Sequence, residues 1–351
     1  MKVTLGKTGI TVSKDGLGAL PLQRAAQADA IRLIQAAADG GIDYIDTARA
    51  YSDSEEKLGL ALKGRREKVV IATKTSASTA GELTRQLETS LALLKTDYVD
   101  IYQLHNPDSV PKQDSEIYKA LLSAKQSGKI LHIGITNHRL HLAKEAVTSG
   151  LYETLQYPLS YLSSAEEQEL PRLCRDNGVG FISMKAFAGG LITDAGLARR
   201  FQNQFDNAVP IWGLQHLWEL ERLLEARDRD GGATLSEADE TKIADELAQL
   251  GGDFCRGCGY CAPCPEGIQI FNCARTSLLI RRAPSKNWFS DAWRDEMLKI
   301  KNCRSCGQCS SRCPYGLDTP ALLRRNLSDY LEQSGRFPHV HSSAISSKPS
   351  L

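Results

Sequence analysis

The sequence lacks several features that would place it in a familiar class. No run approaches the roughly 18 consecutive apolar residues of a membrane-spanning helix, and the N-terminal segment MKVTLGK has no apolar signal core. Positive and negative charges nearly cancel, leaving a formal net charge of +1. The composition therefore favours neither a nucleic acid nor an acidic partner, and we expect a cytoplasmic protein without a membrane contact.

A glycine-rich dinucleotide-binding fingerprint is also missing, although strand-like and helix-like runs alternate along much of the chain. Strands are predicted at 16–20, 42–46, 69–73, 98–104, 130–135, 153–157, 179–184 and 208–213. Helices are predicted around 25–39, 55–63, 80–94, 115–127, 140–149, 165–177, 191–205 and 217–227. Eight such units favour a closed (β/α)8 TIM barrel over an open doubly wound sheet. A small hairpin over 1–13 is predicted to precede the barrel.

Four polar side chains fall at the ends of three successive predicted strands. Asp46 ends the second strand and Tyr51 follows it, while Lys74 and His105 end the third and fourth. Because active sites of parallel barrels lie at the carboxyl ends of the strands, these side chains are expected to meet. A phenol titrates near about 10, so Tyr51 needs a neighbouring cation such as Lys74 to act as an acid at neutral pH.

Taken singly, each of these residues has a structural explanation. A tyrosine after a strand usually packs, a lysine at a strand end is usually solvated, and a lone histidine in a strand is more often a satisfied core residue. Their joint placement at successive strand ends favours a catalytic group in which a proton is given or taken.

The arrangement resembles the aldo/keto reductase family, in which an Asp and a Tyr are followed by a Lys and a His on the next two strands. The segment SEEKLG at 54–59 is similar to the family's helix entry after the tyrosine. The resemblance extends over about residues 1–225. It implies a barrel closed at the bottom by the hairpin, and reversible hydride transfer between a nicotinamide and a carbonyl. The catalytic residues that it implies are Asp46, Tyr51, Lys74 and His105.

The same resemblance implies cofactor contacts at the later strand ends. Thr136, Asn137 and Gln156 match the positions that hold the nicotinamide carboxamide, and Met184 stands where the family often has a stacking aromatic residue. Without the resemblance, turn chemistry and helix capping are the favoured explanation of these polar residues. The glycine pair at 189–190 before a helix suits the close approach of a phosphate. The full set of expected contacts is Thr136, Asn137, Gln156, Met184, Lys185, Gly189, Gly190 and Gly213.

The choice between NADP and NAD is open. After the eighth strand the family usually places a Lys or Arg for the 2′-phosphate, whereas this chain reads LQHLWE at 214–219 and has no fixed cation before Arg222. Phosphate recognition depends on such a cation. The expected cofactor is therefore NADP or NAD.

Eight of the ten cysteines lie in two runs between residues 255 and 313. In a reducing compartment such clustering indicates a metal site rather than disulfides. The first run has two residues between successive cysteines, and the second has three before its last cysteine; a proline follows each run. The runs consist of Cys255, Cys258, Cys261 and Cys264, and of Cys303, Cys306, Cys309 and Cys313.

Dense runs of this kind are typical of ferredoxin-type [4Fe–4S] sites, in which the fourth cysteine of a run ligates the other cluster. By that rule Cys313 completes the cluster of the first run, and Cys264 completes that of the second. A zinc ribbon, with cysteine pairs separated by longer gaps, fits poorly. Because the first run departs from the bacterial spacing at Cys264, Cys273 is its alternative; otherwise Cys273 and Cys174 are buried thiols.

Helical spacing at 268–282 and 293–300 resembles the helical ferredoxin domains of multi-subunit reductases, and a subgroup of aldo/keto reductases carries such a module. The predicted domains are a barrel over 1–227, a linker with a helix over 228–248, a small, mainly helical ferredoxin-like iron–sulfur domain over 249–334 and a disordered tail over 335–351.

Three functions are compatible with these features. The leading one is reduction of a small carbonyl by NAD(P)H, or the reverse, with two [4Fe–4S] clusters in a structural, regulatory or electron-transfer role. The alternatives are an iron–sulfur electron-transfer protein that exchanges electrons with a redox partner protein, and a redox sensor. The substrate, an aldehyde, ketone or sugar, is not specified, because specificity in such barrels lies in the loops.

Overall fold

The computed structural model describes residues 1–250, 253–282 and 286–336, and the chain forms two compact units. The first unit comprises Met1–Phe187 and Asp194–Asp239. The second comprises Ala188–Thr193 and Glu240–Leu351. Most of the predicted tail, from residue 337 onward, lies outside the described residues.

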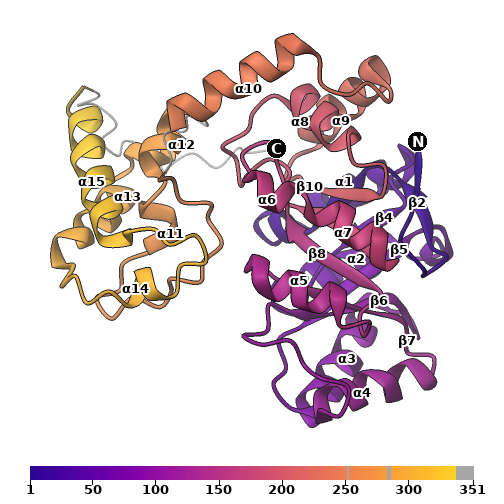
Figure 1. The fold of residues 1–351 in the computed structure, drawn as a ribbon. Helices are drawn as coiled ribbons and strands as arrows, with labels where there is room; N and C mark the ends of the chain where they lie inside the picture. The colour runs from indigo at the N-terminus through magenta and orange to yellow at the C-terminus, as the bar shows by residue number, and fades with distance from the viewer. Residues whose placement is uncertain (251–252, 283–285, 337–351) are drawn as a thin grey trace, which may run out of the picture. The chain divides into compact units, whose positions relative to one another are not determined.

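The first unit is a closed barrel of parallel strands in the order β10, β3, β4, β5, β6, β7, β8, β9, which confirms the predicted (β/α)8 class (Figure 1). Every strand is buried on at least part of both faces, as expected where helices cover a parallel sheet. The strands are β3 (Gly16–Gly18), β4 (Tyr44–Asp46), β5 (Val70–Thr75), β6 (Val99–His105), β7 (Ile130–Thr136), β8 (Thr154–Pro158), β9 (Gly180–Met184) and β10 (Ala208–Gly213).

Helices follow the barrel strands, and most carry an apolar face toward the sheet. In α3 this face includes Leu83, Leu87 and Leu91, which recur at helical spacing and are buried. The helices are η1 (Leu20–Arg24), α1 (Gln27–Asp39), α2 (Ser54–Ala61), η2 (Arg66–Lys68), α3 (Ala80–Leu94), α4 (Glu116–Gln126), α5 (Leu140–Thr148), α6 (Ala165–Gln168), α7 (Leu170–Asn177), α8 (Ala195–Asn203) and α9 (Leu217–Asp230).

Two of the predicted helices differ in the structure. The helix expected at 165–177 is divided into α6 and α7, because Pro171 lies in the first turn of α7 and has no amide hydrogen to continue the preceding helix. The helix expected at 191–205 begins only at Ala195, where the Asp194 side chain accepts a hydrogen bond from the Leu197 amide and caps the new helix.

The N-terminal hairpin consists of β1 (Lys2–Thr4) and β2 (Thr11–Ser13), which pair antiparallel. Val3, Leu5 and Val12 pack against the barrel interior. Gly6 also pairs with Val179, directly before β9 begins. The hairpin therefore closes the amino end of the barrel, and the carboxyl ends of the strands lie at the opposite end.

The second unit is helical around a separate apolar core. The buried side chains of this core include Ile270, Met297, Ile300, Leu323 and Tyr330. Several cysteines of the two cysteine runs pack against it. Its helices are α10 (Glu237–Leu250), α11 (Ile270–Cys273), α12 (Thr276–Arg282), η3 (Lys286–Phe289), α13 (Asp291–Leu298), η4 (Lys299–Asn302), α14 (Gln308–Ser311) and α15 (Thr319–Arg336).

The longest helix of this unit, α15, is not among those predicted from the sequence, although Leu323, Leu327 and Tyr330 recur at helical spacing. Helix α10 is polar around most of its surface, and only Leu250 at its end is buried. Within the described residues, no helix is both long and apolar enough to cross a membrane.

Candidate active site and cysteine cavities

A buried ion pair forms the centre of the barrel site. Lys74 Nζ lies 2.6 Å from Asp46 Oδ1 and donates a second hydrogen bond of 2.6 Å to the Thr47 carbonyl. The register of β4 and β5 pairs Asp46 with Ala72, so Lys74 lies just beyond that pair at the carboxyl end of β5. Both side chains are almost completely buried. Removing either partner would leave an uncompensated charge, which costs about 3–5 kcal/mol.

Two glutamines also donate hydrogen bonds to the Asp46 carboxylate. Gln103 Nε2 and Gln156 Nε2 each donate to it at 3.3 Å, and Gln103 Nε2 is 2.9 Å from Gln156 Oε1. Gly134 in β7 makes room for this contact, because a Cβ there would lie 2.9 Å from Gln103 Cγ. Gln103 is absent from the predicted site. Its position two residues before His105, near the carboxyl end of the same strand, is the signal that could have identified it.

Tyr51 and His105 lie beside this ion pair. Lys74 Nζ is 5.1 Å from the centre of the Tyr51 ring, and the Tyr51 and His105 rings meet edge to face with centres 5.9 Å apart. The structure therefore brings together all of the side chains that were expected to be catalytic. They come from β4, β5, β6 and the segment after β4.

The charges of the site are set by burial and by the ion pair. Burial opposes the charged form of Lys74, but Asp46 and Tyr51 outweigh it and raise the pKa of Lys74 above its usual value. Burial raises the pKa of Tyr51 and Lys74 only partly offsets this, so the phenol stays protonated at neutral pH. Burial and the nearby Lys74 lower the pKa of His105 to about 3, which keeps this imidazole neutral.

The residues expected to contact the nicotinamide carboxamide lie at one level of the sheet. The strand register pairs His105 with Thr136, and Thr136 with Gln156. Gln156 Nε2 lies 3.7 Å from the sulfur of Met184. Asn137, however, uses its side chain to join two loops, because its amide donates to the Pro107 carbonyl at 3.0 Å and its oxygen accepts from the Arg139 amide at 2.8 Å.

These amide and hydroxyl groups have the donor and acceptor types that a carboxamide requires, and the polarizable sulfur of Met184 can cover an aromatic ring. The buried carbonyl oxygen of Gln103 has no hydrogen-bond partner among the described residues, which leaves one acceptor available at the same site. Gln156 and Met184 therefore fit a nicotinamide, whereas Asn137 is already engaged with the backbone.

The segment after β9 contains residues with positive φ, and part of it belongs to the second unit. Lys185 has φ +58°, and Gly189 and Gly190 have φ +65° and +94°. Positive φ at a residue other than glycine costs energy and is frequent at functional sites. Residues 188–193 belong to the second unit, in which the Arg275 guanidinium donates to the Gly189 carbonyl.

The segment after β10 presents aromatic rings, and the exposed Arg24 donates to its Gln215 side chain at 3.2 Å. Gly213 is exposed at the end of the strand. The His216 and Trp218 rings are stacked with centres 6.1 Å apart, and the Arg222 guanidinium lies 5.4 Å from the Trp218 ring centre. Glu219 accepts hydrogen bonds from the Gln215 and His216 amides at 2.6 and 2.8 Å.

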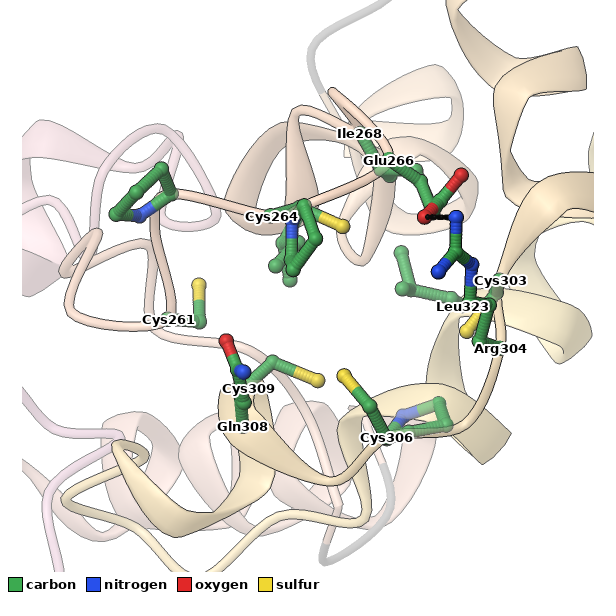
Figure 2. A pocket seen from close by; sticks show the side chains of 14 residues that line it. Cys261, Cys264, Glu266, Ile268, Cys303, Arg304, Cys306, Gln308, Cys309 and Leu323 are labelled. Atoms are coloured by element: carbon green, nitrogen blue, oxygen red, sulfur yellow. Dashed lines mark ion pairs between the residues drawn. The ribbon is translucent and has the colours of Figure 1, made fainter.

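In the second unit, thiols line a cavity of about 190 Å³, here called the Cys306 cavity (Figure 2). The sulfur atoms of several labelled cysteines border this space, and Arg304 pairs with Glu266 at its edge with an N–O distance of 2.7 Å. The cysteines that line it are Cys261, Cys264, Cys303, Cys306 and Cys309.

A smaller cavity of about 20 Å³, here called the Cys258 cavity, is bordered by the other three cysteines of the two runs and again by Cys261. Its thiols are Cys255, Cys258, Cys261 and Cys313. Cys261 borders both cavities, while Cys264 borders the larger and Cys313 the smaller. The thiols are thus grouped across the two runs, as the ferredoxin rule assigns them, and the assignment of individual ligands stays a prediction.

Cys273 and Cys174 border neither cavity. Cys273 is buried in the core of the second unit, and Cys174 is buried in α7 of the barrel. Of the two candidates for the eighth ligand, Cys264 is therefore the one whose thiol faces the Cys306 cavity.

The donor set of the two cavities fits iron–sulfur clusters better than a single ion. Within 1–250, 253–282 and 286–336, no group of three His, Cys, Asp or Glu side chains is arranged to hold one metal ion. Burial raises the pKa of Cys261 to about 12 and also raises the pKa of Cys255. As free thiols these groups keep their protons, so binding of iron must displace them and couples to folding.

Comparison with known proteins agrees with this division. The model of the aldo/keto reductase family matches residues 15–237, which is more than half of the chain. A 4Fe-4S dicluster domain matches residues 254–318. The barrel matches an aldo-keto reductase from Bacillus halodurans in its holo form, with a TM-score of 0.61 and 23% identity over 70% of this chain and 96% of that one. At that identity the match shows the fold alone.

Curated relatives match about half of the sequence. Aldo-keto reductase YhdN of Bacillus subtilis is 32% identical over 54% of this chain and 63% of its own length. L-galactose dehydrogenase of Arabidopsis thaliana is 32% identical over 55% and 67%. NADH-specific methylglyoxal reductase of Escherichia coli is 33% identical over 55% and 69%. With its barrel, its strand-end residues and the family model in agreement, the chain belongs to the aldo/keto reductase family.

Proposed function

We propose that the protein catalyses the NAD(P)H-dependent reduction of a small carbonyl compound to an alcohol, or the reverse reaction. The observation that carries the proposal is the position of Lys74, which pairs with Asp46 at 2.6 Å and lies 5.1 Å from the centre of the Tyr51 ring. A buried, charged ammonium beside a phenol stabilises the phenolate that remains after proton transfer.

Each side chain then has a separate role. When bound, the nicotinamide supplies the hydride. Tyr51, which burial keeps protonated, donates its hydroxyl proton to the developing alkoxide, and Lys74 stabilises the phenolate as it forms. Asp46 keeps Lys74 charged and in place. The neutral imidazole of His105 can donate one N–H to the carbonyl oxygen and so orient it.

Between the two nucleotides, the surroundings of Glu219 support NAD over NADP. This carboxylate occupies the Gln215 and His216 amides at the start of α9, and Arg222 is directed to the Trp218 ring. A 2′-phosphate at the start of α9 would find these amides already occupied by a carboxylate, while the Arg24 guanidinium there donates to the Gln215 side chain. The Escherichia coli relative that is named NADH-specific supports the same choice.

The cysteine unit would carry two [4Fe–4S] clusters, one in each thiol-lined cavity. Free thiolates, and the iron–sulfur clusters that they bind, persist in a reducing compartment, so the proposal includes the cytoplasm as the site of action. A second candidate function, one-electron transfer through these clusters, is favoured by one observation: Cys306 is exposed whereas the other run cysteines are buried or partly buried.

Substitution of Tyr51 tests the proposed reaction. Tyr51→Phe is expected to lower turnover by about 10²–10⁴-fold while nucleotide affinity is kept, because only the transferred proton is lost. Turnover is followed through nicotinamide absorbance against a panel of aldehydes, ketones and sugars, and affinity by calorimetry.

The matched control is Tyr44→Phe, which removes a buried hydroxyl that has no partner among the described residues and lies on the same strand as Asp46. This variant is expected to keep its turnover. Equal activity of Tyr51→Phe and the unmodified protein would exclude Tyr51 as the proton donor.

A further inference from the structure

The cysteine unit has a local charge that the net charge of the whole chain hides. Between residues 299 and 325 there are six Lys and Arg residues and one acidic residue, Asp318. All six cations are exposed. They are Lys299, Lys301, Arg304, Arg312, Arg324 and Arg325.

Four of these cations are here called the basic rim: Lys301, Arg304 and Arg312 belong to the segment that carries the second cysteine run, and Arg324 belongs to α15. Arg304 itself lines the cavity (Figure 2). Arg312 donates at 3.2 Å to the carbonyl of Pro263, next to Cys264, and Arg324 donates to the hydroxyl of Ser305, next to Cys306. Three of the four rim cations therefore line this cavity or contact residues at or next to its lining.

Most of this positive charge is not neutralised. Arg304 is paired with Glu266, which is 20% exposed at its side chain. Among the described residues, Lys301, Arg312 and Arg324 form no ion pair with a carboxylate. Exposed charges of one sign around a single site attract a partner of opposite charge and raise its rate of association.

The same face carries the most accessible of the expected ligands. Cys306 is exposed, whereas Cys309 is buried and Cys303 is half-buried. A cluster held by these three thiols would therefore have one edge near the protein surface. One-electron exchange between two proteins requires such an edge, since the donor and acceptor groups must come close.

We propose that the basic rim around Cys306 is the docking surface for an acidic one-electron carrier protein of the flavodoxin or ferredoxin kind. The inference rests on the proposed cluster in the Cys306 cavity but not on the barrel reaction. In each encounter the reduced carrier loses one electron, and the cluster held by Cys264, Cys303, Cys306 and Cys309 gains it. No bond is formed or broken, and the reverse step returns the electron to the oxidised carrier.

The choice of an acidic protein follows from the charge pattern. The cations surround a thiol-lined opening and are spread over three chain segments, near Pro263, Ser305 and the start of α15. They therefore frame one compact spot rather than the continuous stripe that tracks a nucleic-acid backbone. The whole-chain charge balance, which predicts no acidic partner, misses this local excess.

The test uses the full-length holoprotein with its clusters reconstituted under anaerobic conditions. Reduced flavodoxin, which is acidic, serves as the probe in stopped-flow experiments that follow cluster absorbance. Its second-order rate is expected to fall at least tenfold when the ionic strength is raised from about 0.01 M to about 1 M, because charges are then screened.

Charge reversal locates the surface. The combined variant Arg304→Glu, Arg312→Glu, Arg324→Glu is expected to lower the flavodoxin rate at least tenfold. The matched control, Lys63→Glu, Lys112→Glu, Lys119→Glu, changes the net charge equally at exposed positions of the barrel unit and is expected to leave the rate within about twofold. Iron content and the cluster spectrum are measured for every variant.

If the triple rim variant loses iron, Lys301→Glu alone gives the answer, because this side chain has no ion pair among the described residues and is two positions from a ligand. Binding of flavodoxin by calorimetry, without electron transfer, is an independent readout. Rates that do not depend on salt, equal losses in the rim and control variants, or preferential binding of anionic vesicles or single-stranded DNA would overturn the proposal.

The test is also separate from the barrel chemistry. The carrier is reduced with dithionite, so no nicotinamide is needed, and Tyr51→Phe should have the same flavodoxin rate as the unmodified protein. A protein that reduces no carbonyl compound could then still support the docking proposal. A protein that does not bind flavodoxin could still support the proposed carbonyl reduction.

Discussion

The barrel site and the cysteine unit organise their functional side chains in opposite ways. In the barrel, Lys74 and Asp46 are 2.6 Å apart and the two glutamines complete the coordination of the carboxylate. In the cysteine unit, the thiols border cavities of about 190 and 20 Å³. The barrel site is held by contacts among its own residues, whereas the cysteine unit depends on a group that fills the space between its thiols.

The charge states of the buried groups also differ between the two regions. In the barrel, Asp46 and Tyr51 outweigh the burial of Lys74, so Lys74 keeps its proton, while burial raises the pKa of Asp46 in spite of its partner. Burial raises the pKa of Cys261 to about 12, since neighbouring thiols add repulsion instead of compensation. A preorganised polar site stays charged without its substrate, while a thiolate site becomes charged only with its metal.

Breaking the barrel ion pair should change turnover and barrel stability more than any other substitution considered below. Lys74→Met is expected to lower turnover by at least about 10²-fold and to reduce the free energy of unfolding of the barrel by about 3–5 kcal/mol, because Asp46 is left buried without its counter-charge. Turnover and urea unfolding followed by barrel fluorescence measure the two effects.

The double variant Asp46→Asn, Lys74→Met provides the control. It is expected to regain most of the stability but none of the activity, because the buried charge is gone and the phenolate has no partner. Cluster absorbance should be the same in all three proteins. A double variant as unstable as the single one would show that Lys74 stabilises the barrel by packing instead.

Removing one thiol should affect the cysteine unit alone. Cys264→Ala is expected to lower the iron content by one cluster, roughly half, and to expose α14 and α15 to proteolysis, because the cavity loses the group that joins its walls. The midpoint of barrel unfolding should not change. Iron analysis, cluster spectra and limited proteolysis check the prediction.

Cys273→Ala is the matched control for this change, because Cys273 lies in the same unit but borders neither cavity. It is expected to retain both clusters and to lose only the packing of a buried thiol. Loss of iron from Cys273→Ala with full iron in Cys264→Ala would reverse the ligand assignment.

Acidification should have the smallest effect on the barrel. Burial opposes the charged form of Glu153, but hydrogen bonds from His132, Lys125 and the Ile133 amide hold its pKa at about 2. Because this lies below the unfolded value of about 4.3, the stabilisation is complete above pH ~4.3 and is lost as the pH falls toward 2. The contribution is about 1 kcal/mol, since the side chain is partly exposed.

Urea unfolding of the barrel at pH values from about 5 down to about 3 measures this loss, and Glu153→Gln should flatten the curve in that range. The cysteine unit should respond more strongly over the same range, because its thiolates take up protons and release iron. A Glu153→Gln profile parallel to that of the unmodified protein would assign the acid response to other carboxylates.

Much of the candidate site could be predicted from the order of residues. Asp46, Tyr51, Lys74 and His105 could be placed together because parallel strands deliver their carboxyl ends to one edge. Gln103 could not, because its contact with Asp46 depends on the register of β6 and on the room that Gly134 leaves in β7. The engagement of Asn137 with Pro107 also depends on loop packing.

The basic rim shows the same limit at the protein surface. The whole-chain charge of +1 predicts no charged partner, and the positions of Arg304, Arg312 and Arg324 in the sequence do not reveal that they surround one opening. The contact of Arg312 near Cys264 arises only when the two cysteine runs are brought together, and that of Arg324 near Cys306 only when α15 packs beside the second run. Tertiary folding therefore brings together cations that are separated in the sequence.

The sequence by itself determined the alternation of strands and helices and the two cysteine runs, because both follow from local periodicity and covalent spacing. Only the tertiary structure decided which thiols share a cavity, which amides hold Asp46, and that residues 188–193 belong to the second unit. Those outcomes depend on contacts between segments far apart in the chain, and their geometry is set by barrel closure and core packing.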